Sequence, residues 1–141
     1  MNKKKKFAMG VNKVSEKLCR LPDAELEVMK IVWELDAPIS TIMIMERLKY
    51  KNWHISTVLK LISRLTERGF IKSEKNGRYN VYVPLVNEAV YLKSETKSFL
   101  ERLHGNSVKS LIATLYNTRT ISKEELDEIA KIIEKGGGND V

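Results

Sequence analysis

The sequence predicts a mainly α-helical protein that contains one small β-hairpin. Three observations predict this class. Apolar residues recur at helical spacing in the stretch WHISTVLKLISRLTERGF, residues 53–70. An Asn76-Gly77 pair stands between alternating apolar and polar residues, a pattern typical of a hairpin. Three more helical stripes follow Asn87, and 141 residues with 43% hydrophobic content leave room for one ordinary domain or two small ones.

Charge is unevenly distributed along the chain, whose net charge is +7. Residues 1–20 hold seven Lys or Arg against one acid and lack apolar periodicity, so we expect a basic, disordered arm. Residues 37–84 hold nine against three, whereas residues 85–141 are nearly neutral. Because clustered cations focus an electrostatic field, this segregation predicts a localised anionic partner.

The first helix is predicted over residues 21–35. Pro22 and Asp23 mark its start, and acidic residues in its first turn suit the positive end of the helix dipole. Its apolar residues occupy more than one side, so we expect this helix to be largely buried.

A break at residues 36–38 separates this helix from the next. Ile39 supplies a short strand, and Ser40 or Thr41 caps a second helix that runs to about Lys49. The third helix is the stretch at residues 53–70, where Gly69 suits a left-handed C-terminal cap.

The hairpin completes the first domain. Strand residues 70–75 lead into the Asn76-Gly77 turn, and the second strand ends at Pro84. The order helix, short strand, helix, helix, hairpin is that of a winged helix-turn-helix domain, predicted here over residues 21–84. In such a domain the third helix enters the major groove of DNA and the hairpin forms the wing.

An all-α dimerisation module is predicted over residues 85–135, with a flexible tail at 136–141. Ser122, followed three residues later by Glu125, predicts a capping box for the last helix. A module of about 50 residues without a disulfide buries its apolar stripes poorly alone, so we expect a symmetric dimer. A monomeric helical domain folded back on the winged domain is the alternative. The predicted dimer interface comprises Leu92, Phe99, Leu100, Leu103, Leu111, Ile112, Leu115, Ile129 and Ile133.

The third helix carries the predicted reading surface for DNA. Its expected inward residues are Ile55, Val58, Leu59, Ile62 and Leu65. Lys60 and Arg64 then lie near the outward pole, with Ser56 and Thr57 beside them. Lys and Arg bind guanine O6 and N7, and Ser and Thr bind base edges or phosphates, so this face has the donors that a major groove requires.

Residues outside the third helix complete the predicted DNA contacts. Lys75 and Arg78 flank the wing turn, where we expect them to contact phosphates or the minor groove and to position the protein without reading sequence. Ser40 and Thr41, at the start of the second helix, belong to the same predicted set.

The sequence offers no pattern for an enzyme, a metal site or a cofactor. Cys19 is the single cysteine, and neither His54 nor His104 stands in a metal or nucleophile motif. No glycine loop suited to cradling phosphate is present, so we predict no catalysis. No apolar run approaches the roughly 20 residues of a membrane span, so we expect a cytoplasmic protein without membrane insertion.

Four stretches of the chain resemble the penicillinase repressor family, the BlaI/MecI group. They are LPDAELEVMKIVWEL, NWHISTVLKLISRLTERGFI, GRYNVYVPLV and KSFLERLHGNSVKSLI, in that order. The likeness runs from about Leu21 to Lys135.

The resemblance implies a homodimeric repressor that binds a palindromic double-stranded DNA operator and holds genes of the β-lactamase type off. It also implies induction by proteolysis, started by a membrane sensor protease that acts directly or indirectly. The corresponding scissile bond here lies at Ser98 and Phe99, in the first helix of the dimerisation module.

Two other functions remain open at this point. One is a winged-helix repressor controlled by a small effector that binds the helical module, without proteolysis. The other is a winged-helix protein-interaction module whose basic face binds an acidic partner protein.

Overall fold

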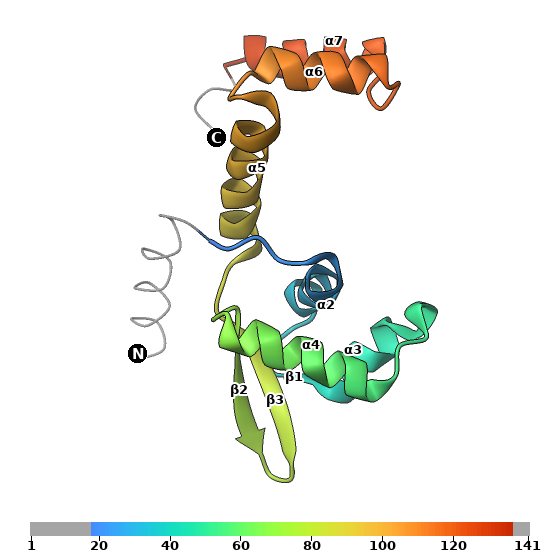
Figure 1. Ribbon diagram of the computed structural model, residues 1–141, viewed down its shortest axis with the longest axis vertical. Helices are drawn as coiled ribbons and strands as arrows, with labels where there is room; N and C mark the ends of the chain where they lie inside the picture. The colour runs from blue at the N-terminus through green and yellow to red at the C-terminus, as the bar shows by residue number, and fades with distance from the viewer. Residues whose placement is uncertain (1–17, 137–141) are drawn as a thin grey trace. The chain divides into compact units, whose positions relative to one another are not determined.

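The structure is a computed structural model that describes residues 18–136, and its elements follow the predicted order (Figure 1). Two compact units divide between Glu95 and Thr96. The first contains α2 (Asp23–Glu34), β1 (Ile39–Ser40), α3 (Thr41–Arg47), the 3-10 helix η1 (Lys49–Lys51), α4 (Ile55–Glu67), β2 (Ile71–Asn76) and β3 (Tyr79–Pro84). Helix α5 (Glu88–His104) contains the division, and α6 (Val108–Asn117) and α7 (Lys123–Glu134) follow it. The predicted class, mainly α with a hairpin wing, is confirmed.

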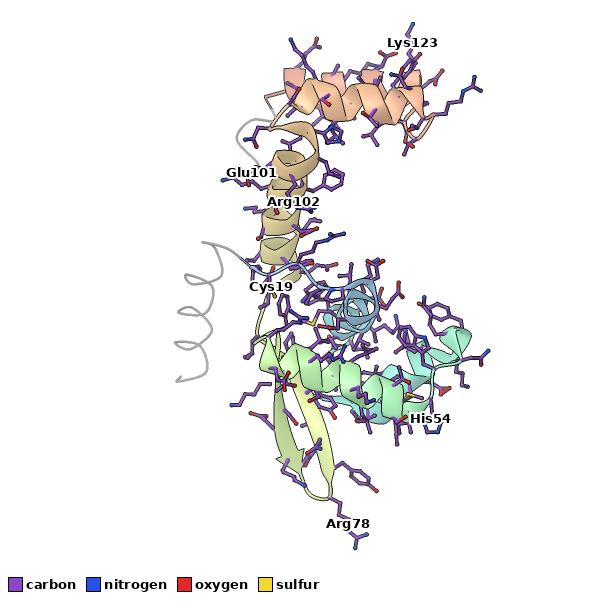
Figure 2. All side chains as sticks on the ribbon, viewed as in Figure 1. Cys19, His54, Arg78, Glu101, Arg102 and Lys123 are labelled. Carbon is purple, nitrogen blue, oxygen red and sulfur yellow. The ribbon has the colours of Figure 1, made fainter. Side chains whose placement is uncertain are left out.

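The three strands form one antiparallel sheet in the order β1, β3, β2. In the hairpin Asn76 pairs with Tyr79, so the two-residue turn consists of Gly77 and Arg78. The predicted Asn76-Gly77 turn was therefore wrong by one residue. Gly77 has φ +69° whereas Asn76 and Arg78 lack a positive φ, and a turn of the II′ kind needs positive φ only at its first central residue. Arg78 consequently stands at the tip of the wing (Figure 2).

The end of α4 is closed by a Schellman motif. Gly69 adopts φ +83° and donates to the carbonyl of Thr66 at 3.0 Å, while Phe70 donates to the carbonyl of Leu65 at 2.9 Å. Phe70 and Leu65 are both fully buried, which adds the apolar contact usual for this motif. The predicted left-handed cap at Gly69 is confirmed, and it turns the chain directly from α4 into the wing.

Aromatic side chains join the two ends of the first unit. Tyr91 packs against Phe70 edge to face, with ring centroids 5.6 Å apart, and against Trp33 at 5.7 Å. The Tyr91 hydroxyl accepts a hydrogen bond from the backbone of Leu21 at 2.9 Å, and burial raises the pKa of this phenol. The core of the first unit thus reaches beyond Pro84 into α5.

One ion pair of the first unit has a buried carboxylate. Glu25 on α2 is 1% exposed, and its Oε1 atom accepts a hydrogen bond from Nε of Arg68 at 2.6 Å. Arg68 also reaches Sγ of Cys19 at 3.8 Å, and its hydrogen bonds to Glu25 and Cys19 raise the pKa of its guanidinium. Because Arg68 is the C-cap of α4, this pair ties α2 to the end of that helix. Arg68 therefore supports the fold of the first unit.

The second unit has no comparable core. Between residues 92 and 136 no side chain is buried, although the three helices carry regular apolar stripes. Their ends are well formed, since Ser107 caps α6 and Ser122 forms the predicted capping box with Glu125 on α7. These helices are specified locally but leave their apolar faces uncovered in the single chain.

The buried ion pair generates a prediction about stability. We expect Arg68→Met to lower the urea midpoint of unfolding more than Glu25→Gln does. The first change strands a buried carboxylate, whereas the second leaves a neutral amide that still accepts from a half-exposed guanidinium. Urea unfolding followed by circular dichroism measures both.

Arg47→Met is the matched control for this prediction, because Arg47 pairs with Glu34 at the surface, where ion pairs add little stability. Its midpoint should stay close to that of the unchanged chain. Equal losses for Arg68→Met and Arg47→Met would contradict a structural role for the buried pair.

Candidate DNA-binding surface

Helix α4 begins at a histidine cap. Nδ1 of His54 accepts from the backbone N–H of Ser56 at 3.2 Å and lies 2.9 Å from the Ser56 hydroxyl oxygen. The exposed His54 side chain stands at the start of α4 in Figure 2. Sequence reasoning did not assign His54 this role, because serine, threonine, asparagine and aspartate are the usual caps.

The inward side of α4 differs from the predicted one. Its buried residues are Val58, Leu61, Ile62 and Leu65. Ile55 is 45% exposed and Leu59 is 43% exposed, so the prediction that both pack inward was wrong. The missing signal was Leu61, which is buried and shifts the centre of the inward side.

Including Leu61 turns the outward pole of α4 by about 50° at 100° per residue. Ser56, Lys60 and Ser63 lie closest to the new pole, together with Glu67. Arg64 and Leu59 then flank the pole on opposite sides, and all of these side chains are exposed. Helix α4 therefore has an exposed polar face centred nearer Ser56 and Lys60 than predicted, with Ser63 added to it and with Arg64 and Leu59 at its two edges.

The nine cations of residues 37–84 separate into two groups. Five are engaged within the protein: Arg47 with Glu34, Lys49 with Glu46, Arg68 with Glu25, Lys72 with Glu74, and Lys51 over the rings of Tyr50 and Trp53. The other four form no ion pair with any residue in the described range 18–136: Lys60, Arg64, Lys75 and Arg78.

These four unpaired cations are the ones predicted to contact DNA. Lys60 and Arg64 lie on α4, and Lys75 is the residue before the last of β2. Arg78 occupies the wing tip (Figure 2). All four are exposed, so each is available to an external anion. The arrangement provides two cations on a helix and two on the hairpin beside it.

The two hydroxyl residues at the start of α3 already have internal partners. The Ser40 hydroxyl accepts from the backbone N–H of Met43 at 3.2 Å and caps α3. The Thr41 hydroxyl lies 3.0 Å from the hydroxyl of the buried Tyr82. A hydroxyl has one donor and two acceptor sites, so Ser40 still has its O–H to offer.

A groove of about 330 Å³ runs between α4 and the sheet. Leu59 and Ile62 supply its aliphatic lining. Polar groups come from Ser63, Thr66 and Glu67 on α4 and from Ser73, Asn80 and Tyr82 on the two wing strands. The groove thus borders the exposed polar face of α4 on the side nearer the wing.

The predicted dimer and cleavage residues lie on α5, α6 and α7. Leu92, Leu103, Ile129 and Ile133 are exposed, at 63%, 61%, 39% and 67%. The others are half-buried: Phe99, Leu100, Leu111, Ile112 and Leu115. Ser98 is also half-buried within α5, and the Phe99 ring packs against His104 at 5.8 Å.

Residues 18–136 contain no group of three or more His, Cys, Asp or Glu side chains arranged to hold a metal ion. None of the helices in this range has the length and apolar character needed to cross a membrane.

Comparison with known proteins identifies the family. The sequence model of the penicillinase repressor family matches residues 21–135. The chain belongs to this family. The resemblance drawn from the four sequence stretches is confirmed, and membership in a family of repressors also confirms that the chain is not an enzyme.

Named members of the family match almost over their full length. A penicillinase repressor of Bacillus licheniformis is 31% identical over 120 residues, covering 85% of this chain and 94% of that protein. The methicillin resistance regulatory protein MecI of Staphylococcus aureus strain N315 is 28% identical over 122 residues, covering 86% and 99%.

Solved structures of BlaI are also similar to this chain. One is the solution structure of the DNA-binding domain of the repressor BlaI, with a TM-score of 0.46. Another is the monomeric form of Bacillus licheniformis BlaI in complex with the blaP half-operator, with a TM-score of 0.45. Each is 34% identical and covers 53% of this chain and 92% of its own.

Proposed function

We propose that this chain is a transcriptional repressor that binds a double-stranded DNA operator in the cytoplasm through α4 and the wing. The observation that carries the proposal is the separation of cations in residues 37–84. Four of these cations have neither an ion pair nor an aromatic ring as partner among residues 18–136, and they lie on those two elements: Lys60, Arg64, Lys75 and Arg78. The membership of this chain in the penicillinase repressor family supports the same function.

The proposed contacts differ between the helix and the wing. Lys60 and Arg64 contact guanine edges in the major groove, and Ser56 and Thr57 contact a base or a phosphate at the start of α4. Lys75 and Arg78 bind phosphates beside the groove, because a wing tip presents point charges and no base-reading face. Ser40 and Thr41 complete the set at α3, where the free O–H of Ser40 donates to a phosphate.

Alanine substitutions distinguish these two kinds of contact. We expect Lys60→Ala and Arg64→Ala to weaken operator binding roughly tenfold and to reduce discrimination against scrambled duplex, because base contacts are lost. We expect Lys75→Ala and Arg78→Ala to weaken binding to operator and to scrambled duplex equally. Each should also reduce the magnitude of the slope of log affinity against log salt by about 1. Fluorescence anisotropy at several salt concentrations measures both effects.

Lys49→Ala is the matched control, because this exposed cation of the same block already pairs with Glu46 at 2.6 Å. Its affinity and salt slope should stay close to those of the unchanged chain. If the unchanged chain bound scrambled duplex as tightly as operator at physiological salt, a sequence-specific repressor would be excluded.

We further propose that the chain acts as a homodimer through α5, α6 and α7. The supporting observation is the absence of any buried side chain between residues 92 and 136. Apolar stripes that the single chain leaves uncovered are stabilised when a second copy covers them. Two linked copies then bind the two halves of a palindromic operator with the gain in affinity that linkage provides.

If the chain is a homodimer, charged substitutions in the proposed interface should halve the mass of the particle in solution. Leu103→Glu and Ile133→Glu each place a charge in the proposed interface, so we expect them to convert a particle of twice 16.2 kDa into one of 16.2 kDa. Sedimentation equilibrium measures the mass. Ile42→Glu is the control, because Ile42 is 71% exposed on α3, outside the proposed interface, and this variant should remain dimeric. A monomeric unchanged chain at micromolar concentration would contradict the proposal.

We also propose that induction proceeds by cleavage of the bond between Ser98 and Phe99, started by a membrane sensor protease. Both residues are half-buried in the middle of α5, and the Phe99 ring is held against His104. Cutting here divides the apolar stripe of α5 and removes the linkage between half-sites. The folded helix protects the bond, since a protease needs an extended backbone.

Fragment masses test the switch. Purified chain incubated with membranes from antibiotic-treated cells is expected to yield fragments ending at Ser98 and beginning at Phe99, read by mass spectrometry. Membranes from untreated cells should leave the chain intact. Repression that is lost in treated cells while the chain stays whole would contradict proteolytic control.

A further inference from the structure

One exposed apolar side chain on the DNA face has no role in the contacts described so far. Leu59 is 43% exposed and lies between the polar residues Ser56 and Lys60 on one side and the groove beside the wing on the other. Single exposed leucines are common on protein surfaces, so exposure alone assigns no function. Its position distinguishes Leu59, because it flanks the outward pole of α4 opposite Arg64.

The groove beside Leu59 has mixed chemistry. Its aliphatic lining comes from Leu59 and Ile62, and the other residues that line it carry polar groups: Ser63, Thr66, Glu67, Ser73, Asn80 and Tyr82. Its volume of about 330 Å³ lies between α4 and the two wing strands. A group that enters here meets an apolar wall from α4 and hydrogen-bonding groups around it.

Major-groove chemistry limits what can cover Leu59 favourably. Guanine, cytosine and adenine present only donors and acceptors in this groove, and covering them with a leucine removes water without replacing its hydrogen bonds. Thymine alone presents a methyl group, at C5. Contact between two apolar groups removes both from water and favours binding.

We propose that Leu59 is a specificity-determining residue that recognises the C5 methyl group of one thymine in each half-site. This inference rests on the proposed operator binding and names a base that the cations do not read. Leu59 points about 100° away from Lys60 around α4 and lines the groove beside the wing, so the thymine lies on the wing side of the base that Lys60 contacts. Leu59 thereby adds a preference for thymine over cytosine, which lacks the methyl group.

Replacement of thymine by deoxyuridine tests the contact, because it removes only the methyl group. The full chain first selects its operator from a random duplex library, and each thymine of one half-site is then replaced singly. We expect one position at which deoxyuridine weakens binding of the unchanged chain by about fourfold, the value of one buried methyl-sized group. Leu59→Ala should bind the two duplexes equally at that position.

Two further variants make the test specific. Lys60→Ala should bind more weakly overall yet keep the fourfold penalty for deoxyuridine, because its neighbour Leu59 is intact. Leu59→Gln should lose the penalty as Leu59→Ala does, and it serves if the alanine variant unfolds. Thermal unfolding followed by circular dichroism checks that each variant folds.

The outcomes separate the two proposals. If no sequence is enriched from the library, operator binding itself fails, and the inference about Leu59 fails with it. If an operator is found but the unchanged chain tolerates deoxyuridine at every position, only the role of Leu59 is overturned. The role of Leu59 is also overturned if deoxyuridine still weakens binding fourfold in both Leu59→Ala and Leu59→Gln.

Discussion

The burial of Phe70 is the constraint on which the first unit depends. Phe70 is fully buried, donates its N–H to Leu65 at the end of α4, and accepts from the backbone of Leu85 at 2.8 Å beyond β3. Its ring also packs against Tyr91 on α5. One residue therefore sets how far the wing stands from α4, and with it the spacing between the helix cations and the wing cations. Gly69 makes this possible, because its left-handed backbone lets the chain turn inward directly after the helix.

The charges of the first unit have two separate uses. Arg68 neutralises the buried Glu25 and holds α2 against the end of α4, where an unpaired carboxylate would be costly. Lys60, Arg64, Lys75 and Arg78 have no such partner among the described residues and supply the surface proposed for DNA. A net charge cannot distinguish these uses, since both groups contribute equally to it. Only the side-chain partners show which cations remain available to an external anion.

The two units differ in how completely a single chain can bury its apolar residues. The first encloses Phe70 and its neighbours without help, because helices and a sheet pack around one centre. The second consists of short helices whose stripes remain at the surface between residues 92 and 136. A few short helices have too much surface for their volume to form a closed core. This difference connects the proposed assembly to the proposed control, because the cut proposed at Phe99 falls in the unit whose apolar stripes the proposed second copy covers.

Local patterns in the sequence determined the order of elements, the cap at Gly69, the capping box at Ser122 and the hairpin, since each depends on neighbouring residues alone. The family followed from motifs in their order along the chain. Only the tertiary structure decided three other features. It moved the turn to Gly77 and Arg78, directed Arg68 inward to Glu25, and exposed Leu59. Helical spacing gives only the relative angles of side chains, and the packing of α4 against the core decides which angle faces inward.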